Sequence, residues 1–217
     1  MTHYFSRIVL TKQGLESRIR DTSYNSYDIH KEVWGLFPGM PDSNRDFVYS
    51  IMDDGRTIYM VSSREPLFND HWMVESKEYD PKINPGDVFR FRLLANPTVM
   101  KTKDNKHKRH DVVMDLKQKL RAEGKEFDMN SIVNSSVSDW VERKASLNGF
   151  KVDHKSLMIH SYTSNKSQKG DRKIIFSTAI IEGVLMVTDV ESFKNCLFKG
   201  IGSAKGFGCG MLMIKHV

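Results

Sequence analysis

Tyr27 and His30 are the residues of this sequence whose types and spacing best suit proton-transfer chemistry. They are three positions apart in a segment with helical spacing, so their side chains would lie on one helical face. A histidine titrates near neutral pH and can accept or donate a proton, and a tyrosine hydroxyl can assist or orient that transfer. A histidine beside an apolar stripe is more often structural than catalytic, so both interpretations stay open on these residues alone.

The helix that would position this pair spans residues 23–37. Its apolar residues follow the spacing of one buried stripe: Ile29, Val33, Leu36 and Phe37. Tyr27 and His30 fall on the flank of that stripe, and Pro38 with Gly39 would end the helix. The pair is therefore predicted at the edge of a buried helix face.

A glycine-rich segment at 200–210 is the second candidate for chemistry, because it contains five of the 14 glycines of the chain. It fits neither a P-loop nor a dinucleotide-binding motif, since too few residues follow it to form the required helix. Glycines allow a backbone to approach a phosphate or another chain closely, and Lys205 adds a cation. We expect this loop to contact a phosphate backbone; a flexible turn before an edge strand is the alternative.

Positive charge is concentrated in the second half of the chain. The 217 residues carry a net charge of +6, but residues 1–96 hold 12 basic and 14 acidic side chains, whereas residues 97–217 hold 21 and 13. Two basic runs contribute: Lys101, Lys103, Lys106, Lys108 and Arg109, and then Lys166, Lys169, Arg172 and Lys173. Either run alone could be a solvated loop, but two in one half favour a surface that binds a polyanion, because each neutralised phosphate releases counterions.

Several classes of protein are disfavoured. Two cysteines are too few for a disulfide framework or a zinc cluster, and the basic neighbours of His107 and His110 would repel a metal ion. The longest mostly apolar stretch, 174–187, is interrupted by Glu182 and is too short to cross a bilayer. We expect no secretory signal, because residues 1–10 contain no apolar core and no small-residue cleavage site. We therefore expect a cytoplasmic protein with no metal site, no cofactor and no membrane partner.

The remaining patterns predict the order β-α-β-β-α-β twice. In the first half they add a short helix at 72–77 and strands at 3–10, 46–52, 57–62 and 88–94. In the second half they predict helices at 112–123, 137–148 and 190–198, and strands at 98–103, 156–162, 173–181, 184–188 and 211–217. This order is typical of ferredoxin-like domains. The sequence thus predicts an α+β chain with two such domains in tandem, residues 1–96 and 97–217.

Four collinear segments carry a family resemblance. They are H-K-E-V-W-G-L-F-P at 30–38 with R-D-F at 45–47, F-R-L-L-A-N-P at 91–97, the stretch 176–187 containing E-G-V-L, and G-I-G-S-A-K-G-F-G-C-G at 200–210. Together they resemble the CasE family, the repeat-RNA processing endoribonucleases of type I-E CRISPR systems, although Leu94 stands where the family has a second arginine. The resemblance spans nearly the whole chain and implies two ferredoxin-like domains of the RAMP type.

The resemblance also implies an activity, the metal-independent cleavage of an RNA phosphodiester. In that reaction the ribose 2′-OH attacks the adjacent phosphorus and the 5′-oxygen leaves, giving a 2′,3′-cyclic phosphate or 3′-phosphate and a 5′-OH. His30 matches the catalytic histidine of the family, and we expect Tyr27 to assist or orient it. Lys205 or Arg45 would stabilise the developing negative charge.

The partner implied by the resemblance is the stem-loop of CRISPR repeat RNA, cut at its 3′ base and retained as crRNA with the other subunits of a type I-E Cascade complex. The expected RNA contacts are Arg92, Lys101, Lys103, Lys106, Lys108, Arg109, Arg143, Lys144, Gly202, Lys205 and Gly206. Trp140 and Phe150 are expected in the core. Two alternatives stay open: a non-catalytic RNA-hairpin-binding module, and a structural ribonucleoprotein subunit that uses the glycine loop for backbone contacts.

Overall fold

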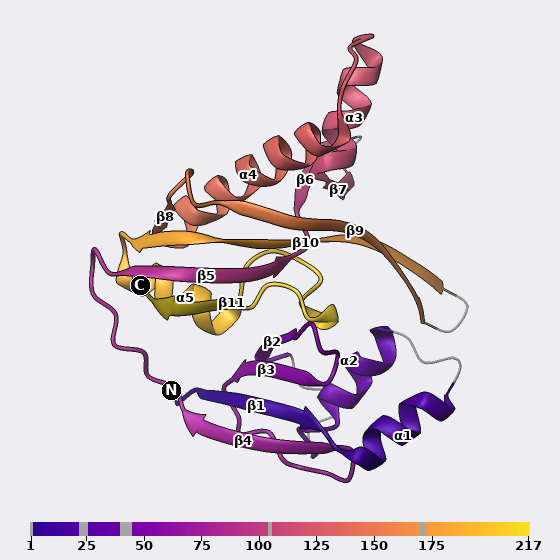
Figure 1. Ribbon diagram of the computed structural model, residues 1–217, viewed down its shortest axis with the longest axis vertical. Helices are drawn as coiled ribbons and strands as arrows, with labels where there is room; N and C mark the ends of the chain where they lie inside the picture. Colours follow the sequence, from indigo (N-terminus) through magenta and orange to yellow (C-terminus); the bar gives the residue numbers. More distant parts are fainter. Residues whose placement is uncertain (1, 22–25, 40–44, 104–105, 170–171) are drawn as a thin grey trace.

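The structure, a computed structural model, describes residues 2–21, 26–39, 45–103, 106–169 and 172–217. Two antiparallel sheets are stacked one over the other (Figure 1). The first has the order β2-β3-β1-β4 and consists of β1 (Tyr4–Leu10), β2 (Phe47–Ile51), β3 (Thr57–Ser62) and β4 (Trp72–Glu78). Helices α1 (Lys12–Arg20) and α2 (Ser26–Trp34) connect β1 to β2 and pack apolar side chains against this sheet.

Strand β4 replaces the helix expected at 72–77, so that prediction is wrong. Its side chains alternate, with Trp72 buried and Met73 exposed, which is the period of a strand. The whole of β4 pairs with β1, about 70 residues earlier in the chain, and this long-range pairing overrides the local pattern. The strands predicted at 3–10, 46–52 and 57–62 are confirmed.

The second sheet has the order β11-β5-β10-β8. Strand β8 pairs with the end of β10, and β9 pairs with its longer first part, residues 172–182. Its strands are β5 (Val88–Ala95), β8 (Phe150–Val152), β9 (Met158–Lys169), β10 (Arg172–Val187) and β11 (Leu212–His216). Helices α3 (Val112–Ala122), α4 (Met129–Leu147) and α5 (Val190–Lys199) share the apolar core of this sheet. Within the described part of the chain, no helix has the length and apolar character needed to cross a membrane.

Both strand orders are those of a ferredoxin-like sheet, and the fold is the expected tandem of two. The change from the first sheet to the second, however, falls between β4 and β5 rather than after residue 96. We expected 88–94 to close the first domain, but β5 pairs with β10 and β11. Its buried face, which includes Phe89 and Leu93, therefore belongs to the second core.

Strand β10 is continuous where we expected a turn. Glu182 pairs with Arg92 and Gly183 with Phe91 in the ladder to β5, so the two predicted strands form one. A Cβ atom at position 183 would lie 3.2 Å from the Phe91 ring and 3.3 Å from the Leu157 Cα. Gly183 thus permits close packing rather than a reversal of the chain.

The basic run after β5 forms a separate hairpin of β6 (Thr98–Lys103) and β7 (Lys106–Asp111). We predicted β6 but not β7. The glycine-rich segment holds a single 3-10 turn, η1 (Lys205–Phe207), and leads into β11. The helices predicted at 112–123 and 190–198 are confirmed, and α4 begins earlier than expected because Asp128 caps it by accepting from the Ser131 backbone N–H at 2.8 Å.

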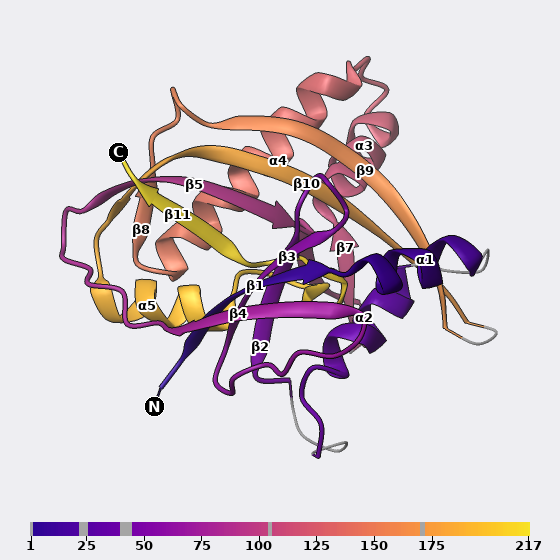
Figure 2. The same cartoon turned by 60° about the horizontal axis from the view of Figure 1, so that its bottom comes forward.

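The two sheets meet through a small apolar cluster. Val48 and Val61 of the first sheet are buried with Met211, and Phe5 and Phe198 pack against them. Helix α5 consequently lies between the sheets (Figure 1). Strands β9 and β10 extend beyond the rest of their sheet toward α2, which β9 contacts (Figure 2). The second domain therefore reaches the helix that carries Tyr27 and His30.

Candidate active site

Helix α2 presents Tyr27 and His30 together, as the sequence predicted. Both side chains are half-buried, and their ring centroids lie 5.7 Å apart. Val33 is fully buried beneath them, and an ion pair of 2.7 Å joins Glu32 to Arg18 of α1. The pair therefore lies on a helix that is anchored both to the core and to its neighbour.

The backbone of Gly206 lies against the ring of His30. A Cβ atom at position 206 would lie 3.2 Å from both Cε1 and Nδ1 of His30, and 3.7 Å from Nη1 of Arg45. The Tyr49 hydroxyl donates a hydrogen bond of 2.7 Å to the Gly206 carbonyl oxygen. Burial raises the pKa of Tyr49 well above its usual value, so this hydroxyl stays a neutral donor. A glycine at position 206 lets the loop backbone approach the His30 ring closely. His30 and Arg45 both lie beside this residue.

Aromatic side chains continue from His30 into the second domain. The Phe207 ring lies 6.3 Å from the His30 ring at an interplanar angle of 28°, and the Phe176 ring of β10 lies 4.7 Å from Phe207. On the other side, Trp34 meets His30 edge-on at 6.3 Å. The orientation of the His30 ring thus depends on contacts from both domains.

The two cations expected to stabilise negative charge are placed differently. Arg45 lies beside Gly206 and His30, whereas the Lys205 ammonium donates a hydrogen bond of 2.6 Å to the Lys199 carbonyl oxygen at the end of α5. Burial, and then the Arg45 charge, lowers the pKa of Lys205; the Lys144 charge contributes less. Arg45 is therefore the better placed of the two to act near His30.

Gly202, another expected RNA contact, lies against the Trp140 ring. Its φ is +80°, and a Cβ atom there would lie 3.0 Å from Cζ2 of Trp140. The next residue, Ser203, forms a hydrogen bond of 2.7 Å with the Asn96 side chain. Trp140 and Phe150 are buried, which confirms their assignment to the core. Gly202 thus shapes the base of the loop, while Gly206 reaches the candidate site.

The β6–β7 hairpin places like charges opposite one another. In its register Lys101 lies opposite Lys108, and Lys103 lies opposite Lys106. Lys108 and Arg109 are exposed. The second basic run lies at the connected ends of β9 and β10: Lys166, Lys169, Arg172 and Lys173.

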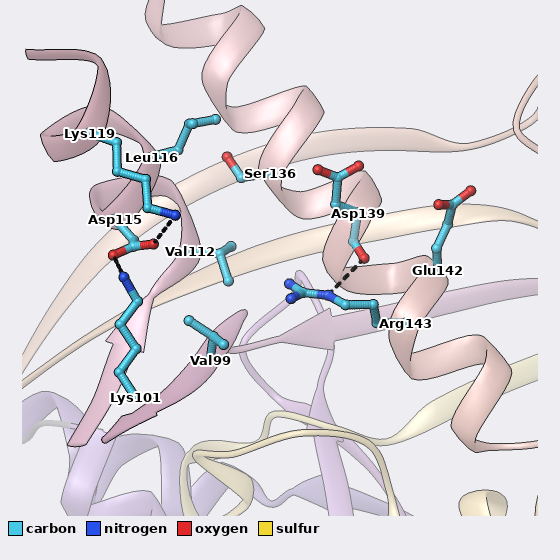
Figure 3. A pocket seen from close by; sticks show the side chains of 10 residues that line it. All are labelled: Val99, Lys101, Val112, Asp115, Leu116, Lys119, Ser136, Asp139, Glu142 and Arg143. Atoms are coloured by element: carbon cyan, nitrogen blue, oxygen red, sulfur yellow. Dashed lines mark hydrogen bonds and ion pairs between the residues drawn. The ribbon is translucent and has the colours of Figure 1, made fainter. Parts of the chain in front are cut away.

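Lys101 and Arg143 line a cavity of about 510 Å³ between the hairpin, α3 and α4 (Figure 3). Lys101 forms an ion pair with Asp115, which Lys119 also contacts at 3.4 Å. Arg143 donates from Nε to the Asp139 carbonyl oxygen of its own helix at 3.2 Å. Lys101 therefore brings less uncompensated charge to the hairpin than its position in the run suggested.

Arg92, also an expected RNA contact, is engaged by two carboxylates. Its guanidinium donates to Glu182 of β10 and to Asp53 of the β2–β3 turn, each at 2.6 Å. His160 contacts the second oxygen of Glu182 at 3.0 Å. Because Asp53 belongs to the first domain, this network links the two domains. The structure thus assigns Arg92 an ion-pair role.

Three residues of the site escaped the sequence analysis: Tyr49, Phe176 and Phe207. The position of Phe207 between two glycines of the loop was the one available signal, since aromatic side chains in such loops often make specific contacts. The contacts of Tyr49 and Phe176 depend on long-range packing. Within the described ranges, no group of three His, Cys, Asp or Glu side chains is placed to hold a metal ion.

Taken together, the arrangement offers a proton donor or acceptor at His30, a hydroxyl at Tyr27, and a cation at Arg45, all beside the half-buried glycine-rich loop. This combination suits a reaction at a phosphate ester, which needs proton transfer and stabilisation of negative charge on oxygen.

Solved structures with the same fold include RNA-bound proteins. The chain is similar to CRISPR endoribonuclease Cse3 bound to a 19-nucleotide RNA, with a TM-score of 0.73 and 20% identity over 99% of this chain and 100% of that one. It is also similar to the CRISPR-associated protein Cas6e from Escherichia coli K-12, with a TM-score of 0.61 and 20% identity over 99% of this chain and all of that one. At 20% sequence identity, the structural similarity to these two proteins shows that the chain has the same tandem fold.

Sequence comparison identifies relatives of the same kind. The chain is 26% identical over 220 residues to the CRISPR system Cascade subunit CasE of Escherichia coli (strain K12), covering 97% of this chain and 98% of that protein. It is 22% identical over 148 residues to the CRISPR-associated endoribonuclease Cse3 of Thermus thermophilus, covering 64% of this chain and 60% of that protein. A family model described as CRISPR associated protein matches residues 3–216. The chain therefore belongs to this family of CRISPR-associated proteins.

Proposed function

We propose that this protein is a metal-independent endoribonuclease that binds the stem-loop of CRISPR repeat RNA and cuts at the 3′ base of the stem. The observation that carries the proposal is the convergence of His30 and Arg45 on Gly206, in a loop of the basic second domain. The names of the relatives support it, since one is an endoribonuclease and another is a Cascade subunit.

His30 transfers the proton in this mechanism. The 2′-OH of the nucleotide before the scissile phosphate attacks phosphorus, its proton is removed, and the 5′-oxygen of the next nucleotide leaves with a proton. His30 serves as the acid or the base for one of these transfers, and the Tyr27 hydroxyl orients it. Arg45 lies close enough to the His30 ring to stabilise charge on the non-bridging oxygens.

Binding and cleavage use different parts of the molecule. The β6–β7 hairpin supplies exposed cations, including Lys108 and Arg109, that contact phosphates of the stem. After cleavage the protein stays on its product and joins the other subunits of a Cascade complex in the cytoplasm. Release of product is therefore slow, and cleavage is best followed in a single turnover.

The test is cleavage of a CRISPR repeat hairpin RNA in excess EDTA. We expect the wild-type protein to cut once, leaving a 5′-OH and a 2′,3′-cyclic phosphate, and His30→Ala to bind without cutting. His154→Ala is the matched control, because His154 is an exposed histidine that follows β8 and forms an ion pair with Glu142 of α4. If wild-type protein binds the hairpin and never cuts it, the alternative of a non-catalytic RNA-binding subunit is correct.

A further inference from the structure

A second cavity, of about 570 Å³, lies between the β6–β7 hairpin, strands β9 and β10, and the glycine-rich loop. Its size is within the range of about 300–1,000 Å³ that is usual for small-ligand sites. It shares Phe207 with the candidate active site, since that ring also lies beside His30. A group bound in this cavity would therefore sit one aromatic ring away from the proposed catalytic histidine.

The walls of this cavity are apolar and partly uncovered. Ile175 of β10 is 67% exposed and Met114 of α3 is 42% exposed, although both are apolar side chains lining a concave surface. Phe176 and Phe207 provide the aromatic side of the cavity. Such walls suit a flat, apolar ring, because stacking on aromatic and aliphatic side chains is what binds unpaired bases in proteins.

Asp111 gives the cavity a polar edge. It caps α3 through Oδ1, which accepts from the backbone N–H groups of Val113 and Met114 at 2.9 and 3.0 Å and from the Tyr162 hydroxyl at 2.8 Å. Its other oxygen, Oδ2, is buried and has no hydrogen-bond donor among the residues that the structure describes. A buried acceptor without a donor is costly, so a donor on a ligand would be favourable here.

The carboxylate also decides what kind of group can enter. A phosphate would be repelled by Asp111, whereas a neutral nucleobase with an amino group can donate to it. Arg109, which lines the same cavity, can donate to a carbonyl oxygen or ring nitrogen of that base. The cavity thus contains apolar walls for stacking, a hydrogen-bond acceptor and a hydrogen-bond donor, which together suit a nucleobase.

We propose that this cavity binds a single unstacked nucleobase that carries an amino group, from a nucleotide adjacent to the scissile phosphate. The inference rests on the proposed function, because it takes the ligand to be the RNA that His30 cuts. It adds a sequence-reading element to a protein whose hairpin contacts would otherwise recognise only charge and shape.

The test is a binding measurement on the CRISPR repeat hairpin RNA, made uncleavable by a 2′-deoxy substitution at the cleavage site. Each of the two nucleotides on either side of the scissile phosphate is replaced in turn by an abasic nucleotide, and affinity is measured by fluorescence anisotropy. We expect one position to lose affinity about tenfold or more. At that position, replacing the amino group by hydrogen should cause part of the same loss.

Two protein variants assign this loss to the cavity. Ile175→Ser removes an exposed wall, and Asp111→Asn keeps a capping oxygen while replacing the buried acceptor by a donor. In both variants we expect the abasic substitution to lower RNA affinity only slightly. In two matched controls, Ile19→Ser on α1 and Asp128→Asn at the start of α4, it should lower affinity as much as in the wild-type protein. Any loss of base pairing in the stem is the same in all proteins and cancels.

The proposal is overturned if no abasic position weakens binding by wild-type protein, or if the sensitive position stays equally sensitive in Ile175→Ser. Thermal unfolding monitored by circular dichroism establishes that each variant is folded; if Asp111→Asn is not, Ile175→Ser decides alone. The binding measurement needs no cleavage. A negative result would therefore overturn the base-binding proposal without bearing on the proposed nuclease activity, which the EDTA assay tests.

Discussion

The helix that carries His30 and the β6–β7 hairpin both present histidines and cations, but they hold them in opposite ways. His30 is half-buried, and its ring lies among Tyr27, Phe207 and the backbone of Gly206. The hairpin histidines and Lys108 are exposed, and lysines lie opposite lysines in its register. Chemistry requires groups fixed to a fraction of an ångström, whereas attraction of a polyanion requires only uncompensated charge at a distance.

This contrast implies that catalysis and affinity separate by region. Changes that move His30 should lower the rate of cleavage at saturating protein and leave affinity unchanged. Changes in the hairpin should do the reverse, and their effect should depend on salt, because the charges there are screened.

The largest effect is expected from filling the space beside His30. Gly206→Val should lower the single-turnover rate constant about 100-fold, because the added side chain displaces the histidine ring by a distance to which catalysis is highly sensitive. Gly206→Ala, with one added carbon instead of three, should give a smaller loss. RNA affinity should change less than twofold in both. An equal loss in the two variants would contradict the steric explanation.

The next effect is on affinity. Lys108→Gln should weaken binding of the repeat hairpin several-fold at low salt and reduce the slope of log Kd against log salt by about one. Lys151→Gln changes a lysine of β8 that is also exposed; it is the control and should change neither quantity. Titrations at four salt concentrations measure the slope, and a Lys108 variant with the wild-type slope would remove the hairpin from the RNA-binding surface.

A smaller effect is expected from the support beneath the loop. Tyr49→Phe removes the hydroxyl that donates to the Gly206 carbonyl oxygen and should lower the free energy of unfolding by about 1 kcal/mol. The cleavage rate should fall by a few-fold, since Gly206 loses one anchor and its position against His30 relaxes. Urea unfolding and single-turnover assays on the same preparation measure both; a stability loss with an unchanged rate would separate the loop from catalysis.

The smallest effect concerns pH and the start of β2. Arg64 donates to both carboxylate oxygens of Asp46, which lowers the pKa of Asp46 in the folded protein. The ion pair of Asp46 with Arg64 therefore stabilises the folded protein fully above the ordinary aspartate pKa, about 3.9. This stabilisation is lost as the pH falls through the lower pKa that Asp46 has in the folded protein. Asp46→Asn should lower the free energy of unfolding by about 1 kcal/mol or less at pH 7 and by less at pH 2. A constant cost at both pH values, by thermal unfolding, would contradict this.

The elements with strong local patterns were predictable. The apolar stripe of α2 is set by neighbouring residues, and it gave the Tyr27–His30 pair its correct place. Helix α1 was not predicted, and its first turn contains Gly14, a poor helix-forming residue. The reason for Gly14 is long-range: a Cβ atom there would lie 2.6 Å from the His71 carbonyl oxygen.

The error in the domain boundary involves contacts between residues far apart in the chain. Strand β5 could have closed either sheet on its own pattern, and only its pairing with β10 and β11 decides. The ion pairs of Arg92 could not be predicted, because its carboxylate partners, Asp53 and Glu182, come from distant segments. The predicted site lacked Phe176 because of a long-range contact as well, since Phe176 meets Phe207, which in turn lies beside His30.

The most direct test of the central claim uses the RNA rather than the protein. If the nucleophile is the ribose 2′-OH, as in the proposed mechanism, a single 2′-deoxy substitution before the scissile phosphate leaves no attacking group. The account predicts that wild-type protein binds this RNA with unchanged affinity and does not cut it, in EDTA or in magnesium. Cleavage at the normal rate would contradict it, because another nucleophile would then be at work.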